Sequence, residues 1–303
     1  MDVVSDILQK IKLSSAIYFK SNFSAPWGMK IPKGPYAQFH MVTKGSCILN
    51  SGREQWNLEE GDIVIFPFGL AHGIADNDTS EQTNGMEVVQ SILNGNSLFA
   101  GTAFSTTLVC GHFEFDRDFE HSFIQELPEI IHLKGADQDQ LPWLKGIVQL
   151  IIEETKITNE GSHIITNKLG EVLFVHSLRA YLLQNKNEKG FIAALQDERI
   201  GKALSAIHNN PDKAWELKAL AQLCGMSRTS FSMQFKALMG ATPLSYLRNW
   251  RVLQAKELLR ESQKSVGEIA ENVGYRSEAA FNRVFKKQVS QTPLKYRQAT
   301  QQG

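Results

Sequence analysis

The sequence predicts a multidomain α+β protein, in which an N-terminal β-barrel with following helices precedes an all-α C-terminal domain with two helix–turn–helix units. Three observations lead to this fold class. Short apolar runs broken by Gly, Pro, Asn and Asp fill residues 16–115, as in a sandwich or barrel. Helical periodicity replaces them from about residue 121. A segment of 29 residues then occurs twice near the C-terminus.

The β domain is predicted from apolar runs of strand length separated by turn residues. These runs cover residues 38–43, 47–50, 63–66, 87–92 and 106–115. A short amphipathic helix over residues 1–12 precedes them, with apolar residues at helical spacing: Val4, Ile7, Leu8 and Ile11.

Two long helices with wide apolar faces are predicted after the β domain, over residues 141–156 and 162–185. The first stripe consists of Leu144, Ile147, Val148, Ile151 and Ile152. The second consists of Ile164, Ile165, Leu169, Val172, Leu173, Val175, Leu178, Leu182 and Leu183. Such faces need a partner surface, which is either the barrel or the same helices of a second subunit in a homodimer. The polar stretch 184–190 is the best candidate for a linker.

The net charge of zero conceals a division between two parts of the chain. Residues 196–303 hold 17 Lys and Arg against 9 Asp and Glu, whereas residues 1–195 hold 15 against 23. A basic part with a net charge of +8 indicates contact with nucleic acid. The three cysteines are an odd number at wide spacing, which argues against a disulfide framework and leaves metal, redox or core roles open. No apolar run reaches the length of a membrane span, and the first residues lack a secretory signal, so we expect no membrane contact and a cytoplasmic location.

The repeated segment has the pattern of a helix–turn–helix. Its copies cover residues 220–248 and 269–297. Ala221 and Gly225 recur 49 residues later as Ala270 and Gly274. After a shift of one residue, seven more identities follow at a spacing of 50: Phe231, Phe235, Lys236, Thr242, Pro243, Leu244 and Tyr246 recur as Phe281, Phe285, Lys286, Thr292, Pro293, Leu294 and Tyr296. The glycines suit a turn with left-handed geometry.

Further helices are predicted near 198–208, 215–223, 227–238, 243–260, 266–273, 277–288 and 293–297. Ser227 and Ser277 stand where the N-caps of two recognition helices are expected. Each Phe pair, at i and i+4, faces the core, which leaves the other residues for a DNA groove. In the first helix these are Arg228, Thr229, Ser232, Met233 and Lys236; in the second they are Glu278, Ala279, Asn282, Arg283, Lys286 and Lys287.

Within these sets, Asn282 and Arg283 suit base edges in the major groove, whereas the lysines suit phosphates, which position the protein without specifying sequence. The helix over 243–260 would be roughly 27 Å long. Successive major-groove faces on one side of DNA are about 34 Å apart, so one chain could place both recognition helices in adjacent grooves.

The C-terminal third resembles the DNA-binding domain of the AraC/XylS family of bacterial transcription regulators. The resemblance covers residues 199–297 and rests on LAQLCGMS, the Phe–Phe–Lys run, TPLSYLRNWRVLQAKELL, and VGEIAENVGYRSEAAFNRVFKK followed by TPLKYR. It implies two helix–turn–helix units on asymmetric promoter sites, and an activator that works near RNA polymerase. The uncharged Thr229, Ser232 and Met233 depart from the charged readers of some relatives.

The segment GDIVIFPFGLAHGIAD resembles the second motif of the cupins, with Gly61, Pro67, Gly69 and His72 in place and Asp76 at the expected Asn position. The first motif has His40 but lacks the paired His and the Glu of metal-dependent cupin enzymes. With WGMKIPKGPYAQFH and LVCGHFEF, the pattern is similar to cupin-like effector domains of the AraC family over residues 5–185. The expected domains are a sensor at 1–135, a helical dimerisation segment and linker at 136–190, and a DNA-binding domain at 191–303.

Four residues of the sensor have ligand chemistry: His40, His72, Cys110 and His112. Cys110 and His112 share a strand face because they are two residues apart, and the resemblance to cupins directs His40 and His72 into the barrel. One interpretation is a tetrahedral Zn²⁺ site. The other is a set of hydrogen-bonded core histidines with Cys110 as a small apolar residue. If the metal is present, oxidation or displacement of a Cys110 thiolate could be the signal.

We therefore predict a DNA-binding transcriptional regulator, not an enzyme, whose sensor responds to a small ligand, a metal or an oxidant. The alternative is a metal-dependent cupin enzyme with an accessory DNA-binding domain, against which the missing ligands of the first motif argue. A third interpretation, a structural nucleoid protein, predicts DNA binding without sequence preference and leaves the sensor unexplained.

Overall fold

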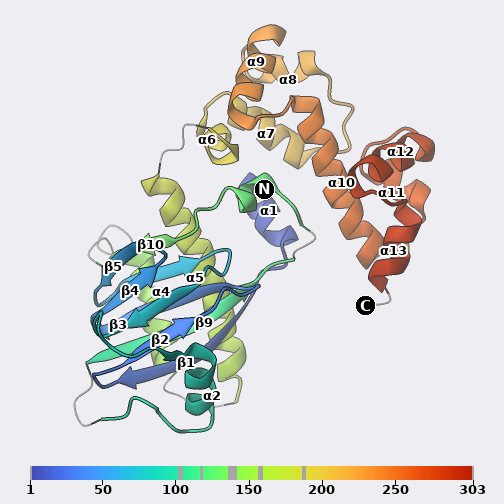
Figure 1. Cartoon of the computed structure of the whole chain (residues 1–303). Coiled ribbons are helices and arrows are strands. Elements are labelled where there is room, and N and C mark those ends of the chain that lie inside the picture. Colours follow the sequence, from blue (N-terminus) through green and yellow to red (C-terminus); the bar gives the residue numbers. More distant parts are fainter. Residues whose placement is uncertain are drawn as a thin grey trace. The chain divides into compact units, whose positions relative to one another are not determined.

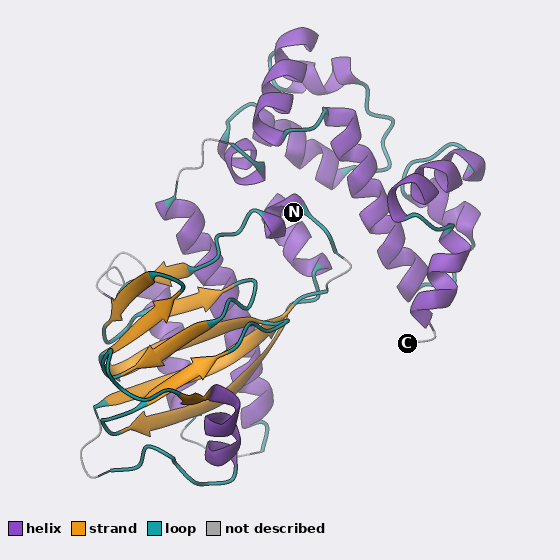
Figure 2. Cartoon of the chain, in the orientation of Figure 1, coloured by secondary structure: helices purple, strands orange, loops and turns teal. Residues whose placement is uncertain are grey.

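The chain divides into two compact units, one that holds all the strands together with several helices and one that is helical (Figure 2). The computed structural model describes residues 2–101, 105–116, 119–135, 142–155, 160–185 and 189–301. The β unit comprises residues 12–115 and 127–185, and the helical unit comprises residues 1–11, 116–126 and 186–303. The expected boundaries at 135 and 190 divide the chain differently, because residues 1–11 and 116–126 pack within the helical unit.

Two five-stranded sheets make up the strands of the β unit (Figure 1). The first has the order β1 (Ser14–Phe23), β9 (Thr106–Glu114), β3 (Ala37–Gly45), β6 (Ile63–Phe66) and β10 (Ile131–Leu133). The second has the order β5 (Glu54–Leu58), β4 (Cys47–Ser51), β7 (His72–Ala75), β2 (Gly28–Ile31) and β8 (Thr83–Asn84). Neighbouring strands are antiparallel except β2 and β8, which run parallel.

The core of the β unit is built from both sheets. Phe23, Leu49, Phe66 and Ile74 are fully buried in one apolar cluster. Alternation of inward and outward residues along the strands allows this arrangement, so a second apolar layer lies on the opposite face of β3 and β9. There Phe39 stacks on Phe113, and Phe113 contacts Phe174 of α5 (Ser162–Gln184), with ring centroids 4.8 and 4.9 Å apart.

The helices α4 (Pro142–Glu154) and α5 begin and end close to the predicted limits. The buried side of α5 includes Leu173 and Leu178, and it covers the first sheet, as one of the two sequence-based interpretations expected. Five apolar residues of these helices stay exposed: Leu150, Ile164, Ile165, Val172 and Leu183. Parts of the expected dimerisation segment and linker, residues 136–141, 156–159 and 186–188, lie outside the described residues.

The prediction of a strand over residues 87–92 is wrong, because this run belongs to helix α2 (Gly85–Leu93). The Asn84 side chain accepts a hydrogen bond from the backbone N–H of Met86 and so caps the helix. Val88, Val89 and Ile92 all pack on the core of the β unit. Their spacing places them on one side of a helix, whereas a strand would direct Val88 and Val89 to opposite faces.

The helical unit contains the expected helices with ends shifted by a few residues. They are α7 (Ile200–Asn209), α8 (Leu217–Leu223), α9 (Arg228–Met239), α10 (Pro243–Glu261), α11 (Val266–Asn272), α12 (Glu278–Val289) and α13 (Pro293–Gln301). The sequence did not predict α6 (Phe191–Gln196) or α3 (Ser122–Gln125). The predicted N-terminal helix is α1 (Val3–Lys10). The long α10 joins the two helix–turn–helix units (Figure 1). Among the described helices, none has the length and apolar character of a membrane span.

Candidate nucleic-acid interface and effector pocket

The two predicted turns have the left-handed geometry that glycine permits. Gly225 has φ of +62° and Gly274 has φ of +85°, which confirms the prediction. A side chain at Gly274 would also meet the carbonyl oxygen of Asp212 at 2.5 Å. The turn of the second unit therefore requires glycine both for its backbone conformation and for its close packing.

Both recognition helices begin at the predicted serine caps. The side chain of Ser227 accepts from the backbone N–H of Ser230 at 3.1 Å, and that of Ser277 accepts from the N–H of Ala280 at 3.3 Å. The four predicted core phenylalanines are fully buried: Phe231, Phe235, Phe281 and Phe285. The caps and the buried rings fix how α9 and α12 lie within their units.

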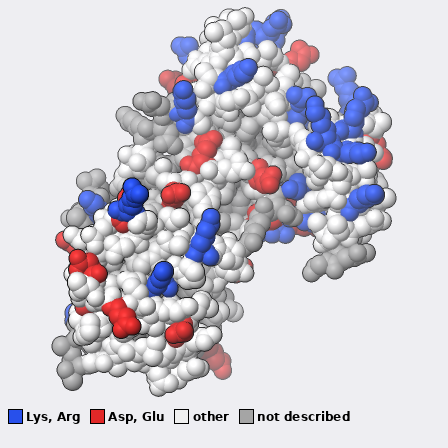
Figure 3. Space-filling model, in the orientation of Figure 1, with Lys and Arg blue, Asp and Glu red and all other residues white. Residues whose placement is uncertain are grey.

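Most of the residues predicted to face DNA are exposed. They are Arg228, Thr229, Met233 and Lys236 on α9, and Glu278, Ala279, Arg283, Lys286 and Lys287 on α12. Ser232 and Asn282 are half-buried. Asn282 Nδ2 makes only a long contact of 3.5 Å to Glu278 Oε1, and its Oδ1 has no partner among the described residues. Lys and Arg gather over the second helix–turn–helix unit in the space-filling view (Figure 3). Arg276, two residues before the start of α12, is also exposed.

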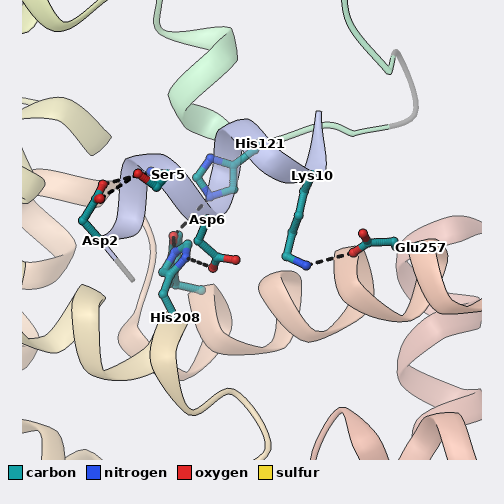
Figure 4. A network of polar contacts seen from close by, with 8 residues as sticks. Asp2, Ser5, Asp6, Lys10, His121, His208 and Glu257 are labelled. Atoms are coloured by element: carbon teal, nitrogen blue, oxygen red, sulfur yellow. Dashed lines mark hydrogen bonds and ion pairs between the residues drawn. The ribbon is translucent and has the colours of Figure 1, made fainter. Parts of the chain in front are cut away.

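A buried polar network holds helix α1 on the helical unit (Figure 4). Asp6 Oδ2 lies 2.8 Å from His208 Nδ1, and His208 Nε2 lies 2.7 Å from the hydroxyl of Tyr246. The same hydroxyl lies 3.1 Å from His121 Nε2. All four residues are buried. Tyr246 belongs to the repeated TPLxY motif, which the sequence connected only with DNA binding.

The hydrogen-bond partners determine the direction of this network. His121 Nδ1 accepts from the backbone N–H of Phe123 at 3.1 Å, so Nε2 carries the proton and donates to Tyr246. Tyr246 then donates to His208, whose Nδ1–H donates to Asp6. Burial lowers the pKa of His121 to about 3. Burial also lowers the pKa of His208, although Asp6 opposes this effect. Both imidazoles are therefore neutral.

Two ion pairs attach the same N-terminal and central segments to α10. Lys10 Nζ lies 2.8 Å from Glu257 Oε2, and Asp116 pairs with Arg260. Helix α1 and residues 116–126 are therefore parts of the helical unit. The sequence could not reveal these contacts, because each joins residues more than a hundred positions apart.

The β unit encloses a pocket of about 340 Å³ between its sheets and α2. Its lining is mainly apolar and includes Phe19, Met29, Ile31, Tyr36, Met86 and Val89. His40 and Cys110, which the sequence singled out, also line the pocket. Two further polar residues of the lining, Gln38 and Tyr18, were not singled out by the sequence. The sequence signal that could have found Gln38 is its position two residues before His40, which places both side chains on one strand face.

Three of the four predicted metal ligands come together as a hydrogen-bonded chain. Cys110 Sγ lies 3.0 Å from His40 Nδ1, and His40 Nε2 lies 2.7 Å from His72 Nε2. His72 Nδ1 donates to the carbonyl of Leu70 at 2.7 Å, so its Nε2 accepts from His40. His40 Nδ1 is then the acceptor for the Cys110 S–H. Burial lowers the pKa of His72 to about 4 and that of His40 well below its ordinary value.

This arrangement does not fit a zinc ion. His40 directs its two ring nitrogens at two different partners, whereas one metal takes one nitrogen from each ring. The two Nε2 atoms are also closer than the roughly 3.3 Å between ligand atoms of a tetrahedral zinc site. His112 lies apart, with Nε2 2.9 Å from Glu114 Oε1 and its ring between Tyr18 and Tyr36. The described residues contain no group of three or more His, Cys, Asp or Glu placed to hold a metal.

The Cys110 side chain is a protonated thiol in this environment. Burial raises its pKa well above the ordinary value, and burial likewise raises the pKa of Cys47 to about 12. A thiolate is the reactive form of cysteine. The geometry therefore gives no support to the hypothesis of a Cys110 thiolate as signal, and it agrees with the interpretation of Cys110 as a buried residue.

Two parts of the chain match known families separately. The cupin family model matches residues 2–183, and a helix–turn–helix domain model matches residues 220–299. A solved structure of the DNA-binding domain of AdpA in complex with a target DNA is 33% identical, covers 34% of this chain and 93% of that chain, and has a TM-score of 0.33.

Three relatives match nearly the whole chain, across both domains. The HTH-type transcriptional regulator AlkR of Acinetobacter baylyi is 31% identical over 98% of this chain and 99% of its own. A putative AraC-like transcription regulator of Streptomyces lividans is 27% identical over 98% of each chain. The transcriptional activator RclR of Escherichia coli is 24% identical over 100% of this chain and 99% of its own. The chain therefore belongs to the AraC-like HTH-type transcriptional regulators that carry an N-terminal cupin domain.

Proposed function

We propose that α9 and α12 read two successive segments of promoter DNA. The observation that supports this proposal is the pair of capped, exposed helices at the two ends of α10, each fixed by a buried Phe pair. Arg283 presents a guanidinium that suits a guanine edge in the major groove. Lys236, Lys286 and Lys287 suit phosphates. Because Asn282 is half-buried, it is a weaker candidate for base contact than Arg283.

The pocket of the β unit is the proposed effector site. Pockets of this size and apolar character are typical of small-molecule sites, and the pocket lies within the cupin domain, for which a sensor role is expected. Binding of the effector changes the affinity of the chain for promoter DNA. No metal enters this proposal, since the donor atoms of His40, His72 and Cys110 are occupied with one another.

The exposed apolar residues of α4 and α5 support a homodimer. Ile164 and Leu183 are 68% and 71% exposed near opposite ends of α5, and an apolar helix face is stabilised by burial against a partner. We propose that a second copy covers this face. The chain is proposed to act as an activator that contacts RNA polymerase, in the cytoplasm where bacterial promoters are accessible.

Fluorescence anisotropy with labelled promoter duplexes tests the DNA-binding proposal. The expected result is sequence-selective binding whose affinity falls steeply with salt, because phosphate contacts release counterions. Equal affinity for the promoter duplex and a shuffled duplex of the same composition would contradict it. Sedimentation of the wild type and of an Ile164→Asp variant tests the dimer, and the variant is expected to shift to monomer.

A further inference from the structure

The pocket of the β unit combines apolar walls with one polar end. We propose that it takes an uncharged, mainly apolar molecule that carries a hydrogen-bond donor, and that Gln38 is the residue that recognises the donor. This inference rests on the proposed function, because it names the chemical class of the effector for that pocket.

The apolar walls determine the body of the ligand. Phe19, Met29, Ile31, Met86 and Val89 line the pocket, and transfer of an apolar molecule from water to such walls is favourable. The ring of Tyr36 adds an aromatic surface, 40% exposed, at the same site. A flat aromatic or compact aliphatic body matches these walls.

One hydrogen-bond acceptor among the lining residues lacks a donor in the described part of the chain. Gln38 Oε1 is buried and has no hydrogen-bond partner among the described residues. Buried acceptors are rarely left unsatisfied, so a ligand with a donor group completes the site.

The deeper polar residues cannot take this role. Cys110, His40 and His72 form a chain in which each proton already has an acceptor. The ligand's donor is therefore recognised at Gln38 and not at His40, although both side chains lie on the same face of β3.

The charge of the lining indicates an uncharged ligand. Among the described lining residues, Lys33 carries the one charged side chain, and it is exposed at the pocket rim. Glu114 is already paired with His112. Burial of a charged group without a partner is strongly unfavourable, so neither a carboxylate nor an ammonium ligand suits the interior.

Three probes of nearly equal shape test the class by calorimetry or by fluorescence quenching. They are 2-naphthol, which has a donor, 2-methoxynaphthalene, which lacks one, and 2-naphthoate, which is charged. The wild type is expected to bind 2-naphthol about tenfold more tightly than 2-methoxynaphthalene, as for one hydrogen bond to a buried acceptor. If 2-methoxynaphthalene or 2-naphthoate binds as tightly as 2-naphthol, the proposal is overturned.

The variant Gln38→Leu removes the acceptor and keeps the size of the side chain. It is expected to lose about tenfold in affinity for 2-naphthol and to retain its affinity for 2-methoxynaphthalene. The matched control is Gln55→Leu on the exposed β5, which should bind both probes as the wild type does. An equal effect on both probes, or none on either, would overturn the role of Gln38. If Gln38→Leu does not fold, the comparison of the three probes on the wild type still decides.

The DNA affinity of the same samples separates this inference from the proposed function. Selective binding of 2-naphthol without any change in DNA affinity supports the ligand class and contradicts the effector role of the pocket. Selective DNA binding together with equal affinities for the three probes supports the regulator and overturns the ligand class.

Discussion

His208 Nδ1 lies 2.8 Å from the carboxylate of Asp6, a residue 202 positions earlier in the chain (Figure 4). Through this bond and through Tyr246, helix α1 and the segment around His121 are tied to the first helix–turn–helix unit. A DNA-binding domain that begins at residue 191 would lack Asp6 and His121. It would leave the hydroxyl of Tyr246 without His121 and the Nδ1 atom of His208 without Asp6.

Replacement of Tyr246 by Phe should destabilise the helical unit by about 1–3 kcal/mol, because it leaves His121 Nε2–H and His208 Nε2 buried without a partner. Urea unfolding followed by tryptophan fluorescence measures the change. The control is Tyr275→Phe, whose hydroxyl has no hydrogen-bond partner among the described residues. Equal stability of Tyr246→Phe and the control would show that the network contributes nothing.

Acid should destabilise the fold in the range between about pH 6.5 and pH 4. Burial lowers the folded-state pKa of His121 to about 3 and of His72 to about 4. Below pH 6.5 the unfolded chain binds protons that the folded chain excludes, so stability rises with pH through this range and is complete above it. Each such histidine contributes a slope of up to about 1.4 kcal/mol per pH unit.

The variant His121→Gln isolates one of these contributions. Its free energy of unfolding is measured from pH 4.5 to pH 8. The slope of this free energy against pH should be smaller than in the wild type, because unfolding of the variant takes up as much as one proton fewer. The control Gln55→Asn, at an exposed position, removes no titrating group and should retain the slope of the wild type. A slope of His121→Gln that equals the wild-type slope would exclude a neutral, buried His121.

Replacement of Arg283 by Ala should weaken binding to the preferred duplex by about 1–3 kcal/mol and relax selectivity at one base pair. Arg53→Ala removes the same charge from an exposed turn of the β unit and is the control. A uniform loss over all sequences would assign Arg283 to a phosphate instead of a base. An affinity equal to that of the control would remove Arg283 from the interface.

The buried thiols should react slowly in the folded protein. Burial raises the pKa of both Cys47 and Cys110, so little thiolate is available near neutral pH. Iodoacetamide labelling at pH 8, followed by mass spectrometry, should modify both residues far more slowly than in urea. Rapid labelling of Cys110 without denaturant would restore the hypothesis of a reactive thiolate.

Local rules predicted the two helix–turn–helix units from their sequence. The Ser caps, the turn glycines and the Phe pairs each depend on a few neighbouring residues, and the repeat shows every one of them twice. Helix α2 was predicted wrongly, because a segment of six residues with three apolar side chains fits a strand and a helix equally well until the cap at Asn84 is recognised.

The candidate site of the β unit was predicted in part. Alternation placed Cys110 and His112 on one strand face, and the resemblance to cupins directed His40 and His72 into the barrel. Neither could show that Cys110, His40 and His72 would bond to one another while His112 lies apart. Gln38 attracted no attention because a glutamine in a strand is unremarkable until its oxygen is found buried without a partner. Such features depend on distances between strands, which no local pattern contains.

Selection of duplexes from a random library tests the central claim most directly. The wild type should enrich one asymmetric site with two half-sites about one helical turn, roughly 10 base pairs, apart, because α10 joins two recognition helices in one chain. Substitution of Arg283 should erase the preference in one half-site only. Enrichment of no sequence, or of a single half-site that is unaffected by substitutions in α12, would contradict the account.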